Sequence, residues 1–165
     1  MGSTLVIGFG NTLRGDDGVG ILAVRSLREQ GRFGPGVCFL EMEAALVNLL
    51  DHLDGVDRLL VVDSIQTPGG TPGQSRRMTL EDLVAAKGEA VSTHQIGLAR
   101  VLDLAGRLGL METRQVDICA FEIAPPPDFS DHPTDATLRD LPAFLSLISS
   151  TIREASAGGS AHGND

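Results

Sequence analysis

The stretch that decides the fold is residues 4–20, TLVIGFGNTLRGDDGVG, in which an apolar run passes into a glycine-rich loop. The β-branched and apolar residues at 4–7 predict a buried strand. The loop at 8–20 holds five glycines around the adjacent carboxylates Asp16 and Asp17. Glycine permits close approach to the backbone, and carboxylates supply hard anionic oxygen. The loop therefore predicts a cation site with Asp17 as ligand. Asp16 is expected to brace the turn or to orient its neighbour, and the glycines are expected to leave room for a bulky substrate.

A phosphate site is the main alternative for such a loop, but neither phosphate-binding motif fits the spacing. The dinucleotide motif GxGxxG would need glycine in place of Leu13. The P-loop motif would need Lys-Ser or Lys-Thr after Gly15, where this chain has two aspartates. Those carboxylates would also repel a pyrophosphate at the N-terminus of the following helix. The sequence thus disfavours a nucleotide site.

Size and charge narrow the class of protein further. A chain of 165 residues with 42% hydrophobic content can bury about two thirds of its unfolded surface. We expect one domain over residues 1–156 and a flexible tail over 157–165, which is rich in glycine and polar residues. The net charge of -9 argues against a nucleic-acid or membrane partner.

Cysteine usage and the lack of targeting signals indicate the compartment. Cys38 and Cys119 fall in apolar runs, which predicts two buried, reduced thiols. The sequence has no signal-peptide pattern and no apolar run of about 18 residues. We therefore expect a cytoplasmic protein.

Hydrophobic periodicity predicts alternating strands and helices. Short apolar runs predict strands over Thr4–Gly8, Val37–Met42, Arg58–Ile65 and Val116–Ile123. Amphipathic patterns predict helices over Val19–Gln30, Ala44–Leu53, Ile96–Leu108 and Thr137–Ala155. One of the segments 75–79 and 89–91 is expected to add an edge strand. The pattern predicts a three-layer α/β/α fold with a mostly parallel, doubly wound sheet of about five strands.

Two further residues are candidates for the same site. Asp63 follows the apolar run 59–62, and a doubly wound sheet brings such strand ends to the loop after the first strand. The alternative is that Asp63 only caps the following turn. His94 precedes or opens a predicted helix, whose dipole favours the neutral imidazole that binds metals, although a histidine there is often only surface. Together with Asp17 these groups suit zinc, nickel, manganese or cobalt. The remaining histidines are expected to be solvated; they are His52, His132 and His162.

Three motifs occur in a fixed order: GFGNTLRGDDGVG at 8–20, VVDS at 61–64 and HQIGL at 94–98. In this order they resemble the signatures of the hydrogenase maturation endopeptidases, which process the large subunit of nickel-iron hydrogenases. The resemblance covers about residues 4–152, nearly the whole chain.

The resemblance implies that Asp17, Asp63 and His94 are the metal ligands and the catalytic residues. The family often has glutamate at the first position, and Asp17 is a shorter but equivalent oxygen donor. The implied activity is that of an aspartyl endopeptidase which removes the C-terminal extension from a nickel-loaded large-subunit precursor. The implied metal is nickel carried by the substrate, or another divalent ion in the resting enzyme. The metal can act as a Lewis acid, or Asp17 or Asp63 can act as a general base, and the sequence leaves both open.

Two other classes of function stay open. The chain lacks the GxSxG, HExxH and Asp-Thr-Gly motifs of common proteases. It also departs from the family at residues 41–45, EMEAA, where a DGGT-like segment is common, and at residues 120–125, where Gly-Ile-x-Pro is commoner. The alternatives are a metal-dependent hydrolase or amidase with another substrate, and a non-catalytic chaperone that recognises the nickel site.

Overall fold

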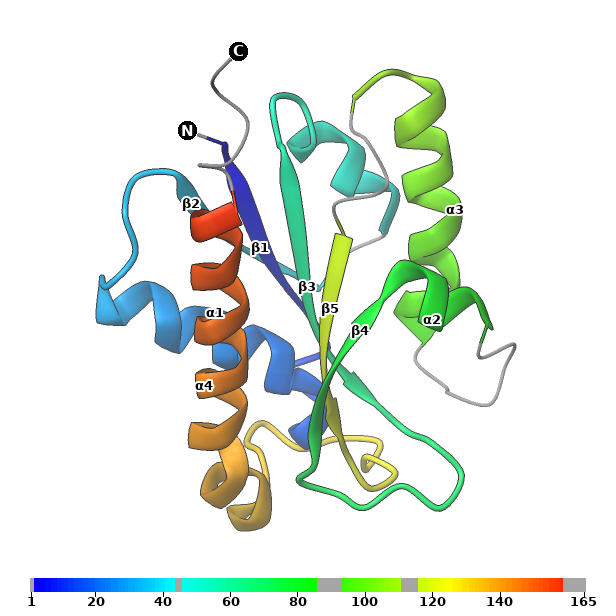
Figure 1. Ribbon diagram of the computed structural model, residues 1–165. Helices are drawn as coiled ribbons and strands as arrows, with labels where there is room; N and C mark the ends of the chain where they lie inside the picture. The colour runs from blue at the N-terminus through cyan, green and yellow to red at the C-terminus, as the bar shows by residue number, and fades with distance from the viewer. Residues whose placement is uncertain (1, 44–45, 86–92, 111–115, 159–165) are drawn as a thin grey trace.

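The computed structural model describes residues 2–43, 46–85, 93–110 and 116–158 (Figure 1). Its secondary structure alternates between strands and helices along the chain, as the periodicity predicts. The strands are β1 (Thr4–Phe9), β2 (Val37–Met42), β3 (Arg58–Ile65), β4 (Ser75–Thr79) and β5 (Val116–Glu122). The helices are η1 (Gly15–Gly18), α1 (Val19–Gln30), η2 (Leu46–His52), α2 (Leu80–Ala85), α3 (Thr93–Arg107) and α4 (Asp135–Gly158), of which η1 and η2 are 3₁₀ helices.

The sheet has the strand order β2-β1-β3-β5-β4. Neighbouring strands run parallel except β4, which pairs antiparallel with β5 at one edge. The predicted edge strand is thus Ser75–Thr79, and the predicted mostly parallel sheet of about five strands is confirmed. The strand order reverses at β1, because β2 pairs with one side of β1 and β3 pairs with the other.

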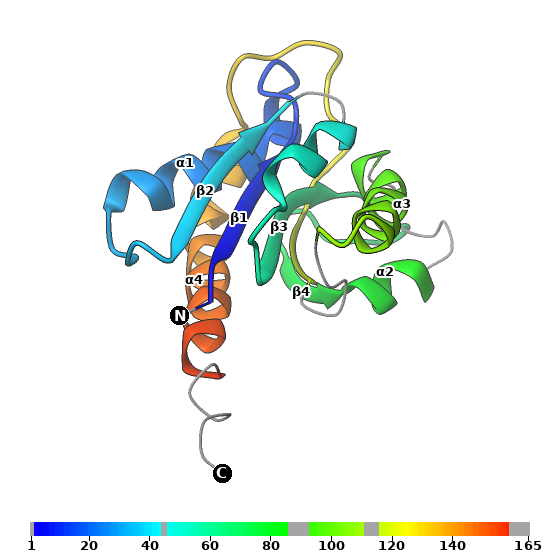
Figure 2. The ribbon, with the colours of Figure 1, turned by 90° about the horizontal axis from the view of Figure 1, so that it is seen from above.

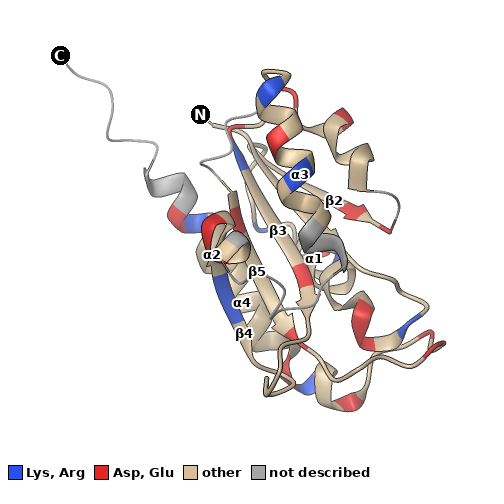
Figure 3. Cartoon of the chain, turned by 90° about the vertical axis from the view of Figure 1, so that its right-hand side faces the viewer, with Lys and Arg blue, Asp and Glu red and all other residues tan. Residues whose placement is uncertain are grey.

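Helices cover both faces of the sheet, which gives the predicted three layers. Figures 1 and 2 show α1 and α4 on one face and α2 and α3 on the other. The residues of β3 alternate between the two: Leu60 and Val62 pack with α1 and α4, whereas Leu59 and Val61 pack with α3. Charged residues lie mainly on the helices, loops and strand ends, and most of the sheet is uncharged (Figure 3).

Helix α1 packs unusually closely on the strands because of glycine. A Cβ on Gly20 would come within 3.0 Å of the carbonyl oxygens of Phe9 and Val62, and a Cβ on Gly8 would meet the Gly20 carbonyl as closely. Real Cβ atoms essentially never make such contacts. The helix ends at Gly31, whose φ of 60° is a left-handed C-cap conformation that glycine adopts without strain.

Several boundaries differ from those predicted. The segment predicted as a helix over 44–53 forms only the 3₁₀ helix η2, with residues 44–45 outside the described residues. Helix α3 begins at Thr93 rather than Ile96, and α4 runs on to Gly158, two residues into the predicted tail. The short helix α2 was not predicted, because six residues are too few to show a helical period.

The prediction for one cysteine is wrong. Cys119 is buried in β5, but Cys38 is exposed, and both are free thiols. Cys38 lies on β2, which forms the edge of the sheet and is only partly covered. Apolar neighbours in sequence indicate a strand, but they do not reveal whether that strand lies at an edge. Among the described residues, no helix combines the length and apolar composition needed to cross a bilayer.

Candidate functional site

Three loops meet at the carboxyl edge of the parallel strands. The loop at 10–18 follows β1, the loop at 66–74 follows β3, and the loop at 123–134 follows β5. All three lie at the lower end of the molecule in Figure 1, and the loops after β1 and β5 lie side by side in Figure 2 as well. In doubly wound sheets ligands bind outside the carboxyl ends of the strands, where the strand order reverses. Asp17 lies in the first of these loops, and Asp63 lies near the carboxyl end of β3.

Asp63 lies inside β3, two positions before its end, and its side chain is completely buried. Its Oδ1 accepts a 2.8 Å hydrogen bond from the backbone N–H of Ser64. Because β3 continues through Ile65, this bond does not cap a turn, which was the alternative interpretation. The alternation of side chains along β3 directs Asp63 to the same face as Val61, the face that α3 covers.

Asp17 lies in η1 and is half-buried. Its Oδ1 accepts a 3.2 Å hydrogen bond from the hydroxyl of Ser64. Ser64 therefore donates to both acidic residues, with its backbone N–H to Asp63 and its side chain to Asp17. The sequence includes Ser64 only as the last residue of the VVDS motif and assigns it no role of its own.

Asp16 braces the loop, as predicted. Its carboxylate is buried and accepts hydrogen bonds from the backbone N–H of Thr134 at 2.8 Å and from the Thr134 hydroxyl at 3.0 Å. Thr134 lies just before α4, at the end of the loop that follows β5. These hydrogen bonds connect the loop after β1 to the start of α4. The role of Asp16 is therefore to fix the position of this loop.

The glycines of the loop have a different role from the one expected. A Cβ on Gly10 would collide with the carbonyl oxygen of Asp17, and one on Gly18 would come to 3.0 Å from the Cα of Thr12. Gly10 also has a φ of 150°, a conformation that other residues rarely adopt. The group that approaches these glycines is the chain's own backbone. They shape the turn that presents Asp17, and the prediction that they leave space for a substrate is wrong.

His94 lies in the first turn of α3, which confirms the prediction that it stands at the start of a helix. Its side chain is outside the described residues. Helix α3 covers the face toward which Asp63 is directed. Within the described ranges, no group of three or more His, Cys, Asp or Glu side chains is arranged to hold a metal ion. The predicted ligand set of Asp17, Asp63 and His94 includes one side chain, that of His94, which lies outside the described residues.

The other histidines do not take part in the site where they are described. His52 is exposed on η2, and His132 is exposed with its Nδ1 2.7 Å from Asp131. His162 lies outside the described residues. The prediction that His52 and His132 are solvated is confirmed.

A buried acid that the sequence analysis missed lies at the end of β5. Glu122 is 5% exposed and accepts hydrogen bonds from the backbone N–H and the hydroxyl of Thr67, at 2.6 and 2.8 Å. Gly70 packs so closely that a Cβ there would collide with this carboxylate. Glu122 thus fixes the loop after β3. Its signal was the same as that of Asp63, an acid ending an apolar run.

Residues 41–43, at the end of β2, make internal contacts of their own. Glu41 accepts hydrogen bonds from Arg25 and Arg28 at 2.7 and 2.5 Å, and Glu43 accepts one from the Thr12 hydroxyl at 2.6 Å. The hydrogen bond from Arg25 lowers the pKa of Glu41 from its ordinary value, and Arg28 adds to the effect. Glu43 thereby connects the end of β2 to the loop that carries Asp17.

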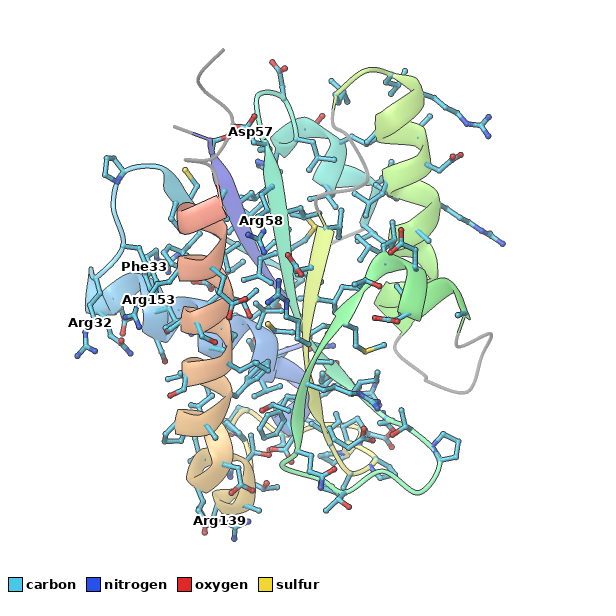
Figure 4. All side chains as sticks on the ribbon, in the orientation of Figure 1. Arg32, Phe33, Asp57, Arg58, Arg139 and Arg153 are labelled. Carbon is cyan, nitrogen blue, oxygen red and sulfur yellow. The ribbon has the colours of Figure 1, made fainter. Side chains whose placement is uncertain are left out.

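An open cavity of about 470 Å³ lies elsewhere, between the end of α1 and α4. Arg32, Pro142 and Arg153 are among its lining residues. In Figure 4, Arg32 and Arg153 lie apart from Arg139, which marks the N-terminal part of α4, next to the carboxyl edge of the strands. This cavity is therefore separate from the acidic site.

Fold and site together define a class: a doubly wound α/β protein with buried and half-buried carboxylates at its topological switch point. The amino-acid sequence assigns the protein to one family within this class. The family model for hydrogenase maturation proteases matches residues 21–130, well over half of the chain, and the chain belongs to this family. Asp63 and His94 lie inside the matched range, and Asp17 precedes it.

Curated relatives agree with this assignment. The hydrogenase expression/formation protein HoxM of Cupriavidus necator is 32% identical over 108 residues, which is 64% of this chain and 52% of HoxM. The hydrogenase 2 maturation protease of Escherichia coli is 32% identical over 98 residues, 59% of this chain and 60% of that protein. The chain matches about half the length of HoxM and somewhat more of the second relative.

Solved structures share the fold over almost the whole chain. The hydrogenase maturating endopeptidase HybD from E. coli has a TM-score of 0.79 at 24% identity, covering 93% of both chains. The maturation protease HybD from Thermococcus kodakarensis has a TM-score of 0.73 at 23% identity, covering 90% of this chain and 98% of that one. The three-layer α/β fold is thus the fold of these proteins.

Proposed function

We propose that this protein is an endopeptidase that removes the C-terminal extension from the nickel-loaded precursor of a nickel-iron hydrogenase large subunit. Membership of the hydrogenase maturation protease family supports the reaction class. The name of the E. coli relative, hydrogenase 2 maturation protease, supports a hydrogenase precursor as the substrate.

One observation carries the assignment of the site: Ser64 donates hydrogen bonds to both Asp17 and Asp63. Asp17 comes from the loop after β1, and Asp63 comes from β3. A single residue thus connects the two acids at the switch point, where a ligand would bind. His94, at the start of the helix covering the Asp63 face, is the proposed third member.

The chemistry of these groups fits a nickel ion held by the substrate. Carboxylate oxygen and imidazole nitrogen are both suitable ligands for divalent nickel. Asp17, Asp63 and His94 would then recognise the loaded precursor by completing the coordination of a metal that the substrate's own thiolates already hold. The ion would supply Lewis acidity toward a nearby carbonyl. In the second route, Asp17 or Asp63 accepts a proton from the attacking water.

The test is cleavage of a purified large-subunit precursor from the same organism, with and without nickel, followed by mass spectrometry of the C-terminal peptide. We expect nickel-dependent release with the wild-type chain, and at least a hundredfold slower release with Asp17→Asn, Asp63→Asn or His94→Ala. His52→Ala is the matched histidine control, because its side chain is exposed on η2, outside the three loops that meet at the site.

Each alternative gives a different result in this assay. Full processing by Asp17→Asn and His94→Ala would refute the assignment of the ligands. A stable complex with the precursor without loss of the peptide would indicate a chaperone. Metal-dependent hydrolysis of other peptides or amides, with no action on the precursor, would indicate a different hydrolase.

A further inference from the structure

Two large apolar side chains are exposed on the loops that border the acidic site. Leu13, in the loop after β1, is 53% exposed, and Phe129, in the loop after β5, is 70% exposed. Isolated apolar side chains are common on protein surfaces, but adjacent ones at the edge of a site indicate an interaction surface. An aromatic side chain is the type that contributes most when an interface covers it.

Backbone pairing holds these two residues next to each other. The N–H of Ser130 donates to the carbonyl of Leu13, and the N–H of Gly15 donates to the carbonyl of Ser130, both at 2.8 Å. Arg14 and Ser130 form a parallel bridge, so that Leu13 and Phe129 each directly precede a member of the bridged pair. The loops after β1 and β5 are consequently joined directly beside Leu13 and Phe129, and Figure 2 shows the two loops side by side.

The paired segments around Leu13 and Phe129 are also connected to the acidic site. Leu13 lies four positions before Asp17 in one loop. Asp16 binds Thr134, which follows Phe129 in the other loop. Because the backbone is already ordered, covering Leu13 and Phe129 costs less conformational entropy than covering side chains on a free loop.

The charged residues beside Phe129 indicate which kind of peptide segment can bind at Leu13 and Phe129. Asp128 and Asp131 lie on either side of Phe129 in sequence, and both are exposed. The hydrogen bond with His132 lowers the pKa of Asp131, which keeps its carboxylate ionised. Together with the net charge of -9, these two carboxylates favour a basic segment over an acidic one beside Phe129.

We propose that Leu13 and Phe129 form an apolar docking rim that binds a segment of the protein substrate with apolar side chains flanked by basic ones. This inference rests on the proposed function, because it takes the precursor as the occupant. The rim positions the chain next to Asp17 and takes no part in bond cleavage. Its loss therefore raises KM and leaves kcat unchanged.

The experiment measures binding and cleavage separately on the nickel-loaded precursor. Binding is measured with the precursor immobilised on a biosensor, and cleavage kinetics are measured by release of the C-terminal peptide. We expect Leu13→Ala and Phe129→Ala each to weaken binding and raise KM about tenfold. Phe129→Leu should retain most of the affinity.

Leu108→Ala is the matched control. Leu108 is 59% exposed and follows α3, which ends at the opposite edge of the molecule in Figure 1. Thermal melting of each variant checks that the chain is folded. Since both rim side chains are exposed, their removal should leave the melting temperature unchanged.

The possible results separate the docking rim from the proposed function. Cleavage by the wild type, with unchanged binding by both rim variants, overturns the rim and leaves the function intact. Binding without cleavage, weakened by the rim variants, supports the rim and refutes the protease. A wild-type chain that neither binds nor cleaves the precursor overturns both.

Discussion

The hydroxyl of Ser64 lies 3.2 Å from Oδ1 of Asp17, although the two residues are 47 positions apart in the chain. The backbone N–H of the same serine donates to Asp63. Asp17 is therefore held by a residue that belongs to the strand carrying the second acid. This bond orients Oδ1 of Asp17, whereas Oδ2 accepts no hydrogen bond from the residues that the structure describes.

Replacing Ser64 with alanine should lower kcat/KM on the precursor at least about tenfold, because a hydrogen bond to a charged group contributes about 1.5–3 kcal/mol. The backbone bond to Asp63 survives this change, so Asp63 should stay in place. Cleavage assays would measure the effect, with Ser26→Ala as the control, since that serine in α1 makes no side-chain hydrogen bond within the described part of the chain. Unchanged kinetics of Ser64→Ala would show that the bond does not position Asp17.

Replacing Gly20 with alanine should destabilise the protein by about 3 kcal/mol, because the new methyl group would collide with two carbonyl oxygens of the sheet. Urea unfolding would measure the loss. Gly34→Ala is the matched control, because a Cβ there has open space around it. Equal stability of the Gly20→Ala variant and the wild type would contradict the close packing of α1 on β1 and β3.

The two thiols should differ strongly in reactivity. Cys38 is exposed and should react with a thiol reagent such as DTNB in the native protein. Cys119 should react only after unfolding, because burial raises the pKa of its thiol to about 11. The Cys38→Ser variant should lose the fast reaction, and a fast reaction that persists in that variant would place Cys119 at the surface.

The ion pairs of Glu41 should make a pH-dependent contribution to stability. Its pKa is lowered from the ordinary value of 4.5, chiefly by the hydrogen bond from Arg25. A carboxyl with a lowered pKa stabilises the fold above its unfolded pKa, and this contribution is lost as the pH falls through the folded pKa.

Glu41→Gln should therefore cost about 0.5–1 kcal/mol at pH 7, because both arginines are half-exposed, and the difference from the wild type should shrink below about pH 4.5. Denaturant unfolding at several pH values would measure it. Glu81→Gln, on the exposed surface of α2, is the control. A stability difference that stayed constant down to pH 3 would contradict the role of this ion pair.

The local sequence determined most of the secondary structure. The boundaries of β2, β3 and α1 are those that periodicity predicts, because the alternation of apolar residues reports which faces are covered. Asp17 and Asp63 could also be selected from the sequence: Asp17 lies in the glycine-rich loop, and Asp63 follows an apolar run, where burial of a carboxylate costs free energy unless it is hydrogen-bonded or paired. The order of motifs identified the family that the comparisons then established.

Only the tertiary structure decided which residues meet. The bonds from Ser64 to Asp17 and from Thr134 to Asp16 join residues 47 and 118 positions apart, and no local pattern encodes such pairs. The structure also placed Cys38 on an edge strand and showed that Gly10 and Gly20 accommodate the chain's own backbone. Hydrophobic periodicity indicates whether one face of a strand or helix is buried. Which residues bury that face depends on how segments that are distant in sequence pack together. For the glycine loop at 8–20, the sequence determined where the turn and its carboxylates lie, and the packing of α1 and the loop after β5 decided what each of them does.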